Sequence, residues 1–422
     1  MTRTRNVVLL TIDALRADHV SSLGYHRRTT PNIDQLATEN LLYENAYSVS
    51  SHTREAVAGI LTGRYPDESV DQHYQLRSDS IPEWLGDEVD VSAAFHSNPF
   101  LSRAFGYGAG FDTFEDGYRS ASRSLALLQR AVDKLRNRHY TRARDINEQA
   151  LSWLDGISIE DSFFLWNHYM DTHGPYLPVS EYRTLFTDRE MPDGRLQALY
   201  HRAVQEPDTI STEDRDLLVD MYDAEVRYTD TQVGQLLAAL DRRGLLQETT
   251  VVVTADHGEA FGENGNFEHP RYLTPELTHV PLIVRFPGDV TARVDSTVST
   301  LDILPTFLED AEDAAELPGR SLREPVHDEA ADRIVYGQVS GEGEESTIRR
   351  FGAWSRAGRA KGYVDLESEE SAITRKDDPQ LGEALAAHMG TRIDAPERAT
   401  PRKRTSVPDA VERRLTALGY DR

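Results

Sequence analysis

Two runs of apolar residues, each as long as a β-strand and each followed by an aspartate, constrain the fold of this chain more than any other feature. The first is Asn6–Ile12, which stops at Asp13. The second, Thr249–Thr254, is rich in β-branched residues and has Asp256 just beyond it. Such continuous runs are typical of parallel strands buried on both faces. Since ligands of parallel sheets bind beyond the carboxyl ends of the strands, we expect both carboxylates on one rim of a sheet.

Further strand and helix patterns alternate along the same part of the chain. Short apolar runs predict strands at Val91–Phe95, Phe163–Tyr169 and Pro281–Phe286. Periodic apolar positions predict helices from Thr53 towards Gly63, over Ala143–Leu154 and over Leu217–Leu240, and Thr30-Pro31 marks the start of another. This alternation predicts an α/β fold with a central, mostly parallel sheet and helices on both faces.

The composition changes after about residue 308, where an acidic, alanine-rich stretch precedes the loop Leu317–Gly319. Beyond it the sequence offers short strand candidates at Ile334–Val339 and Gly362–Leu366 and a final helix at Ala410–Leu418. We therefore expect one large domain over residues 1–325 and a small C-terminal α+β layer over residues 326–422.

The charge of the chain excludes one class of partner. Its formal net charge is −25, and lysine occurs only at Lys134, Lys361, Lys376 and Lys403. Nucleic-acid binding requires basic patches, so nucleic acid is not an expected partner. An acidic surface with few lysines favours a halophilic protein, because high salt screens the repulsion between like charges. An ordinary acidic enzyme is the alternative.

Cysteine is absent, which excludes disulfides, a thiolate nucleophile and sulfur metal ligands. No stretch approaches the ~18–20 apolar residues that a membrane span needs. The run Val7–Leu10 is too short for the apolar part of a signal peptide. We therefore expect a soluble, cytoplasmic protein.

The segment Asp256-His257-Gly258-Glu259 places two kinds of metal ligand side by side after a strand. Carboxylate and imidazole together suit zinc, manganese or a similar divalent ion. Gly258 lets the backbone turn sharply, so that both side chains can point inward. His269 follows twelve residues after His257, in a loop rich in glycine and asparagine. A metal centre is one interpretation of this segment, and an ordinary surface turn is the other.

A second segment, Asp171-Thr172-His173-Gly174-Pro175-Tyr176, follows the predicted strand that ends near Met170. A histidine in a Gly-Pro loop at the end of a strand is well placed to bind a metal. The alternative is a loop histidine that bonds only to the backbone.

A third segment, Ser50-Ser51-His52-Thr53-Arg54, precedes a predicted helix. A hydroxyl at the N-terminus of a helix meets the positive end of the helix dipole, which favours an alkoxide and an incoming anion. Threonine is a poor nucleophile until a base or a metal lowers its pKa. Thr53 is therefore either a reacting hydroxyl or simply the N-cap of the helix.

Eight segments, in this order, closely resemble the sulfatase family: Ile12-Asp13-Ala14-Leu15-Arg16-Ala17-Asp18, Gly24-Tyr25, Thr30-Pro31-Asn32-Ile33-Asp34, Thr62-Gly63-Arg64-Tyr65-Pro66, Asp171-Thr172-His173-Gly174-Pro175-Tyr176, Asp256-His257-Gly258-Glu259, Val280-Pro281-Leu282-Ile283 and Asp302-Ile303-Leu304-Pro305-Thr306. The resemblance covers about residues 6–322. It implies the fold of the alkaline phosphatases, with Asp13, Asp256 and His257 as metal ligands.

The resemblance also indicates the nucleophile. Sulfatases carry a Cys or Ser, later oxidised to formylglycine, nine residues before the Thr of a Thr-Gly pair. Counting back nine residues from Thr62 gives Thr53, which cannot become formylglycine. Ser50 imitates the sulfatase pattern in a register three residues away, with Arg54 last. Formylglycine chemistry at Ser50 is therefore the alternative.

The two lysines that hold sulfate in sulfatases have no counterpart, since no lysine occurs over residues 1–133 or 135–360. Thr53, the Asp-His-Gly-Glu segment and His269 resemble instead phosphoethanolamine transferases, lipoteichoic acid synthases and nucleotide phosphodiesterases. In those relatives a metal-activated threonine takes up the phosphoryl group. The resemblance therefore favours phosphate as the ester, with sulfate as the alternative.

These motifs predict a metal-dependent hydrolase or transferase of sulfate or phosphate esters, with one or two divalent ions (Zn, Mn or Ca). The predicted metal residues are Asp13, Thr53, Asp171, His173, Asp256, His257 and His269, and the predicted catalytic residues are Thr53, Arg54 and His173. Two ions ~3.5–4 Å apart would clamp the attacking and leaving oxygens of an in-line displacement. Arg54 either contacts the transferred oxoanion or forms a salt bridge.

The expected substrate is a small-molecule, glycan or lipid-head-group ester of an oxoanion. Thr53 would form a phosphothreonine that water or an alcohol then resolves. A degenerate fold kept as a binding module is the remaining alternative, and the complete set Asp13, Thr53, Asp256 and His257 argues against it.

Overall fold

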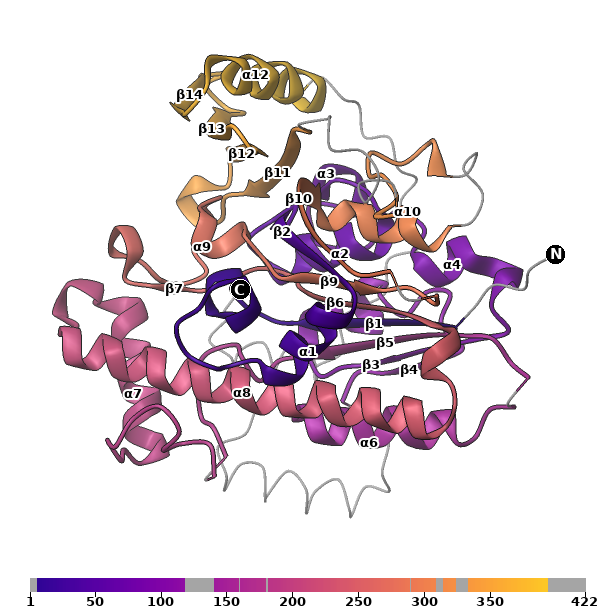
Figure 1. The fold of residues 1–422 in the computed structure, drawn as a ribbon. Helices are drawn as coiled ribbons and strands as arrows, with labels where there is room; N and C mark the ends of the chain where they lie inside the picture. The colour runs from indigo at the N-terminus through magenta and orange to yellow at the C-terminus, as the bar shows by residue number, and fades with distance from the viewer. Residues whose placement is uncertain are drawn as a thin grey trace.

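The computed structural model describes residues 6–117, 140–308, 314–323 and 333–393, apart from the single residues 159, 180 and 289. Its main sheet has eight strands in the order β10-β2-β9-β6-β1-β5-β3-β4 (Figure 1). The strands of this sheet are β1 (Asn6–Ile12), β2 (Leu41–Tyr47), β3 (Val91–Phe95), β4 (Thr113–Glu115), β5 (Phe163–Tyr169), β6 (Thr249–Ala255), β9 (Leu282–Arg285) and β10 (Ala292–Ser299). All pairings in it are parallel except those of β9, so the predicted mostly parallel sheet is confirmed.

Strand β9, predicted as Pro281–Phe286, runs antiparallel to its neighbours β2 and β6. A parallel return needs a crossover of a dozen or more residues, usually a long helix. Between β6 and β9 the described chain forms the short hairpin β7 (Ala260–Phe261) and β8 (Phe267–Glu268) and the single-turn helix α9 (Pro275–Thr278). None of these described elements is long enough to return the chain to the amino end of β6. Strand β9 therefore starts at the rim where β6 ends and runs antiparallel to it.

Helices cover both faces of the main sheet. One face carries α1 (Pro31–Glu39), α6 (Ala143–Leu154) and the long α8 (Thr212–Arg242), and the other carries α2 (Thr53–Thr62) and α10 (Ile303–Phe307) (Figure 1). Successive side chains of a strand point to opposite faces. In β1, Val8 and Leu10 therefore pack under the first group of helices, and Val7 and Leu9 under the second. The shorter helices α3 (Pro66–Ser69) and α4 (Ile81–Leu85) and helix α7 (Asp193–Gln205) complete this part.

A second sheet follows near the C-terminal end of the described chain. It is antiparallel, in the order β11 (Val335–Ser340), β12 (Ile348–Ser355), β13 (Gly358–Asp365) and β14 (Ser371–Lys376), and helix α12 (Pro379–Ile393) packs on it through Leu381, Leu385 and Met389. The predicted α+β layer is thus confirmed, with β12, β14 and α12 added to it. The helix predicted at Ala410–Leu418 lies outside the described residues.

The second sheet contacts the main sheet beyond the carboxyl end of β2. The ring of Tyr47, the last residue of β2, stacks on Trp354 with ring centroids 5.1 Å apart. The backbone amide of Gln338 donates to the carbonyl of Val49 at 2.8 Å. These contacts place the loop after β11 beside the N-terminus of α2.

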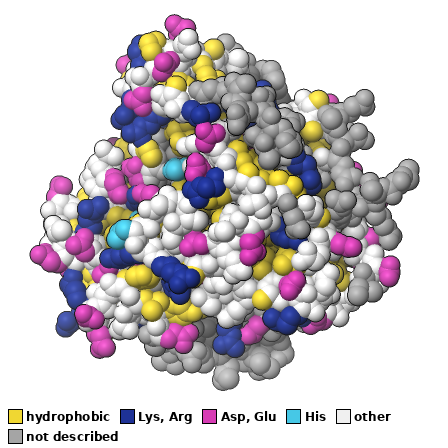
Figure 2. Space-filling model, in the orientation of Figure 1, with side chains coloured by type: hydrophobic (Ala, Val, Ile, Leu, Met, Phe, Trp, Pro, Cys, Tyr) yellow, Lys and Arg dark blue, Asp and Glu magenta, His cyan; other side chains and the backbone are white. Residues whose placement is uncertain are grey.

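Over the described ranges, no helix combines the length and the apolar character that crossing a bilayer requires. Figure 2 shows acidic and basic side chains interspersed over the described part of the visible face.

Candidate metal centre and active site

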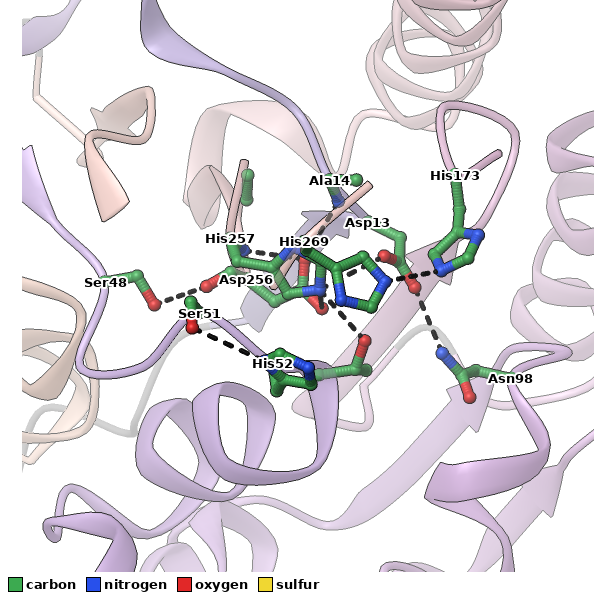
Figure 3. A network of polar contacts seen from close by, with 12 residues as sticks. Asp13, Ala14, Ser48, Ser51, His52, Asn98, His173, Asp256, His257 and His269 are labelled. Carbon is green, nitrogen blue, oxygen red and sulfur yellow. Dashed lines mark hydrogen bonds and ion pairs between the residues drawn. The ribbon is translucent and has the colours of Figure 1, made fainter. Parts of the chain in front are cut away.

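Asp13 and Asp256 lie side by side at the rim of the main sheet. Asp13 follows β1 and Asp256 follows β6, and these strands pair with Ile12 opposite Ala255. Both carboxylates are fully buried. Figure 3 shows them together, with the imidazoles of His173, His257 and His269 close by. The register of two adjacent parallel strands thus produces the pair of acids that the sequence predicted on one rim.

In each of the two carboxylates, only one oxygen has polar partners within hydrogen-bond distance among the described residues. Asp13 Oδ2 accepts from Asn98 Nδ2 at 3.0 Å and lies 3.2 Å from His168 Nε2. Asp256 Oδ1 accepts from the backbone amides of Ala14 at 3.1 Å and His257 at 2.8 Å. The amide of Ala14 is aimed by a left-handed backbone (φ 57°), a conformation that costs a residue with a side chain about 1–3 kcal/mol.

The other oxygens, Asp13 Oδ1 and Asp256 Oδ2, accept no hydrogen bond from the described part of the chain. Burial and the charge of Asp13 raise the pKa of Asp256. Burial also raises the pKa of Asp13, but the hydrogen bond of His168 and the charges of His173, His168 and His257 bring it below its ordinary value. Two buried acids with unused oxygens repel each other unless a cation lies between them, so the donor set fits a divalent metal ion.

His257 is oriented by its own neighbour. Its Nδ1 donates to the carbonyl of Gly258 at 2.8 Å, which leaves the Nε2 lone pair for the centre. Nε2 lies 3.6 Å from both Asp13 Oδ1 and Asp256 Oδ2. Gly258 is needed for a reason other than a sharp turn: a Cβ there would lie 2.0 Å from the carbonyl oxygen of Glu276.

Thr53 is the first residue of α2, and the N-cap position belongs to His52. The Thr53 hydroxyl lies 3.1 Å from His257 Nε2 and donates to its lone pair (Oγ1 to Nε2). The alternative interpretation of Thr53 as a cap is therefore wrong. Ser50 uses its hydroxyl differently, donating to Glu55 Oε2 at 3.2 Å.

His173 and His269, which the sequence predicted as metal residues, form a pair at the same rim. His173 Nδ1 donates to the carbonyl of Gly174 at 2.7 Å, and its Nε2 lies 3.0 Å from His269 Nε2, within hydrogen-bond distance. Burial and the charges of His257 and His173 lower the pKa of His269 well below its ordinary value. The ring of His52 stands edge-on to His269 at a centroid distance of 4.8 Å. Two imidazoles in hydrogen-bond contact, such as His173 and His269, can share and pass on one proton.

Asp171, also predicted as a metal residue, is engaged elsewhere. Its Oδ1 lies 2.7 Å from Arg142 Nε, and its Oδ2 accepts from the amide of Ala143 at 2.9 Å. The same arginine binds Glu225 with two hydrogen bonds, at 2.9 and 2.6 Å. Both oxygens of Asp171 thus hold the start of α6. Asp171 was predicted as a metal ligand, and this prediction is wrong.

Arg142→Ala is expected to lower the free energy of unfolding by about 3–5 kcal/mol, because it leaves two buried carboxylates without their cationic partner. Arg144→Ala is the matched control, since Arg144 pairs with Glu148 on the surface, at side-chain exposures of 70% and 62%, and its loss should change the free energy of unfolding far less. Urea unfolding monitored by circular dichroism measures both. Equal losses in the two variants would contradict a supporting role for Arg142.

His168 lies among the candidate metal ligands, although no sequence pattern indicated it. One ligand atom from each of Asp13, His168 and Asp256 lies within 4.8 Å of the others. His168 stands inside the fully buried strand β5, opposite Thr11 of β1, whose hydroxyl lies 2.8 Å from His168 Nδ1. The sequence feature that could have indicated His168 is a single histidine in a mostly apolar strand, one residue before the end of the strand.

Arg54 meets the second of its two predicted roles. Its guanidinium forms an ion pair with Glu342 of the C-terminal layer at 2.9 Å.

The sequence pattern of the family described as Sulfatase matches residues 5–313. Human iduronate 2-sulfatase is 30% identical over 371 residues, which are 76% of this chain and 66% of that protein. The mouse iduronate 2-sulfatase is 25% identical, and this chain covers 59% of it. The chain therefore spans somewhat less than two thirds of these curated relatives.

Two solved structures share the fold. One, described as a complex with its substrate D-glucosamine-2-N,6-O-disulfate, has a TM-score of 0.70 at 19% identity and covers 94% of this chain and 99% of its own. The other, a phosphonate monoester hydrolase from Silicibacter pomeroyi, has a TM-score of 0.67 at 19% identity and covers 92% and 94%. The same fold thus occurs in proteins named for sulfur and for phosphorus substrates.

Proposed function

Because this chain belongs to the sulfatase family, we propose that it is a metal-dependent hydrolase of sulfate or phosphate esters in which Thr53 is the nucleophile. The observation that carries this proposal is the hydrogen bond between Thr53 Oγ1 and His257 Nε2, 3.1 Å long, beside two buried carboxylates with unused oxygens. A hydroxyl held by an imidazole at a cationic centre is the arrangement that activates a serine or threonine.

The proposed metal ligands are Asp13, Asp256 and His257, with His168 as a further donor. When bound, the ion lowers the pKa of the nearby hydroxyl and offsets negative charge on the ester oxygens. The unpaired oxygens of the two acids, their mutual repulsion and the position of His257 Nε2, 3.6 Å from both of these oxygens, support this donor set. Carboxylate and imidazole ligands are compatible with zinc and manganese.

In the proposed reaction, the Thr53 oxygen forms a bond to phosphorus, and the bond from phosphorus to the leaving alkoxide breaks. The proton that Thr53 loses ends on this alkoxide, and the hydrogen-bonded pair His173–His269 is the proposed relay that takes up the proton and passes it on. Water then attacks the phosphothreonine and the bond from phosphorus to the Thr53 oxygen breaks. One proton of this water returns to the Thr53 oxygen and the other stays on the released phosphate, which restores the starting state.

Sulfate esters are the second candidate substrate class, and the names of the relatives favour them. Iduronate 2-sulfatase and the complex with a glucosamine disulfate both point to sulfated sugars. The absence of cysteine and the position of Thr53 favour phosphorus esters instead. The Ser50 alternative is weakened because Ser50 donates to Glu55 rather than to a residue of the metal centre.

A parallel assay of four aryl esters separates these classes: a sulfate, a phosphate monoester, a phosphate diester and a phosphonate monoester. We expect kcat/KM for one of the phosphorus esters to exceed that for the sulfate by at least about tenfold, a difference of about 1.4 kcal/mol in the barrier. Each ester is assayed at low and high salt, because the net charge of −25 favours a halophilic protein. A clear preference for the sulfate would overturn the phosphorus assignment but not the ester hydrolase.

A further inference from the structure

Three donors from distant parts of the chain converge on one oxygen beside the proposed centre. Glu342 Oε1 accepts from Arg54 Nη2 at 2.9 Å, from the Tyr74 hydroxyl at 3.0 Å and from Arg271 Nη2. The Arg54 guanidinium also lies 3.7 Å from the centroid of the Tyr74 ring. Burial raises the pKa of Tyr74 to about 12, so its hydroxyl remains a donor at neutral pH.

The two arginines are more deeply buried than the acid that joins them. The side chains of Arg271 and Arg54 are 8% and 18% exposed, whereas that of Glu342 is 49% exposed. Arg271 Nη1 binds Glu55 at 3.1 Å and the carbonyl of Ser340 at 2.9 Å. Its Nε is buried and has no hydrogen-bond acceptor among the described residues. One donor of the cluster is therefore unused while Glu342 is in place.

The charges of this cluster balance only while Glu342 is present. Two arginines against Glu55 and Glu342 give a net charge of zero, and removal of Glu342 leaves a net charge of +1. Buried guanidinium groups need an anionic partner, because an unpaired buried charge is strongly unfavourable. A half-exposed carboxylate is the component that another anion can most easily replace.

The cluster lies directly beside the reacting groups. Arg54 follows Thr53, and Arg271 follows His269 after one proline. The charges of Arg271 and Arg54 both reach His52, where they help burial to lower its pKa. Arg54 and Arg271 therefore adjoin Thr53 and His269 along the chain, and Tyr74 joins them through Glu342 and its contact with the Arg54 guanidinium.

We propose that Arg54, Arg271 and Tyr74 form a subsite for a second anionic group of the substrate, a sulfate, phosphate or carboxylate, and that Glu342 occupies this subsite when substrate is absent. The inference rests on the proposed ester hydrolysis, since it names an additional feature of that substrate. A tetrahedral oxoanion has several oxygens and can use the three donors that Glu342 Oε1 uses together with the spare Nε of Arg271. Glu342, supplied by the C-terminal layer, then acts as a replaceable internal ligand.

The competing explanation is a salt bridge that only tethers the C-terminal layer to the main domain. A tether predicts that loss of Glu342 lowers stability and creates no anion site. A replaceable ligand predicts that the same loss opens a site for a free oxoanion. Selenate, a sulfate analogue with a strong anomalous X-ray signal, distinguishes the two because its binding requires no turnover.

The test compares Glu342→Gln with Glu345→Gln. Glu345 lies in the same loop and makes the same kind of contact, an ion pair to Arg350 at 2.8 Å, so the control removes one equal charge outside the cluster. Thermal unfolding with increasing selenate gives the apparent affinity of each folded variant. Anomalous diffraction from crystals grown with selenate locates the bound anion.

In Glu342→Gln we expect selenate to bind between Arg54 and Arg271 at least about tenfold more tightly than in the unsubstituted protein or in Glu345→Gln. The reason is that the substitution removes the negative charge that competes with selenate for the two arginines. Early unfolding of Glu342→Gln without added stabilisation by selenate, or no selenate between the two arginines, would overturn the subsite and leave only a tether. A folded Glu342→Gln protein with the affinity of the control would also overturn it. None of these results depends on Thr53. The selenate experiment can therefore contradict the subsite while Thr53 remains the nucleophile, and the reverse.

Discussion

Thr53→Ala is expected to lower kcat/KM by roughly 10⁴-fold or more for every ester that the protein hydrolyses, because it removes the atom that forms the covalent bond. The hydroxyl lies at the N-terminus of α2 and donates to His257 Nε2 at 3.1 Å, so the substitution removes one buried hydrogen bond and little packing. The fold should therefore survive, at a cost of about 1 kcal/mol. Steady-state kinetics and thermal unfolding of the same preparation measure the two effects.

Ser50→Ala is the matched control for this experiment. It removes a buried hydroxyl three residues earlier that donates to Glu55, and it should leave most of the turnover in place. Intact-mass and peptide mapping of the unsubstituted protein should show Ser50 unmodified. Oxidation of Ser50 to formylglycine, or activity that survives Thr53→Ala and is lost in Ser50→Ala, would show that the nucleophile was assigned to the wrong residue.

Chelation of divalent ions is expected to lower turnover by about 10³-fold, because several kcal/mol of charge stabilisation in the transition state depend on the cation. Zinc, manganese or calcium added back one at a time should restore activity and raise the melting temperature, since an ion that binds only the folded state stabilises it. Thermal unfolding thus reports on metal binding without any substrate.

Asp256→Asn makes this test sharper, because we expect it to stabilise the metal-free protein and to abolish the stabilisation by metal. The amide keeps the size of the carboxylate and can still accept from Ala14 and His257 through its oxygen. It removes the repulsion between two buried acids, so the metal-free protein should gain on the order of 1 kcal/mol in stability. The rise in melting temperature on adding metal should disappear.

Asp18→Asn is the control for the metal experiment. Asp18 is an acid near the same rim that pairs with Arg16 at 2.7 Å, and 60% of its side chain is exposed. Its replacement should leave the metal-induced rise in melting temperature unchanged. A rise that persists in Asp256→Asn would remove Asp256 from the ligand set.

The two acids of the centre could be predicted from local patterns alone. Asp13 and Asp256 follow continuous apolar runs, and parallel strands bring such ends to one rim whatever the order of the strands between them. Thr53 was identified through the resemblance to sulfatases, by its distance of nine residues from Thr62, and both residues belong to one helix, α2. The antiparallel direction of β9 was not predictable, since an apolar run looks the same in either direction.

The residues that the sequence misjudged are those whose partners lie far away along the chain. Asp171 stands in a promising loop, but Arg142, placed by the start of α6, takes its carboxylate. His168 is hidden in the apolar pattern of β5 and reaches Asp13 only because β5 pairs with β1. The direction of a side chain at a strand end depends on neighbours of this kind, and the periodicity of the local sequence does not reveal them.

Sequence patterns were enough to predict the α/β sheet and the rim that carries its two acids, and the resemblance to sulfatases added His257 and Thr53. The sheet and the rim follow from periodicity within single elements, which short-range sterics and burial control. The packed fold was needed to bring His168 beside Asp13, to pair Asp171 with Arg142, and to place Glu342, 288 residues beyond Arg54, in a cluster with it. Those pairings arise from strand order and from the docking of the second sheet, because charged groups are held by whichever partner the packed fold brings within reach.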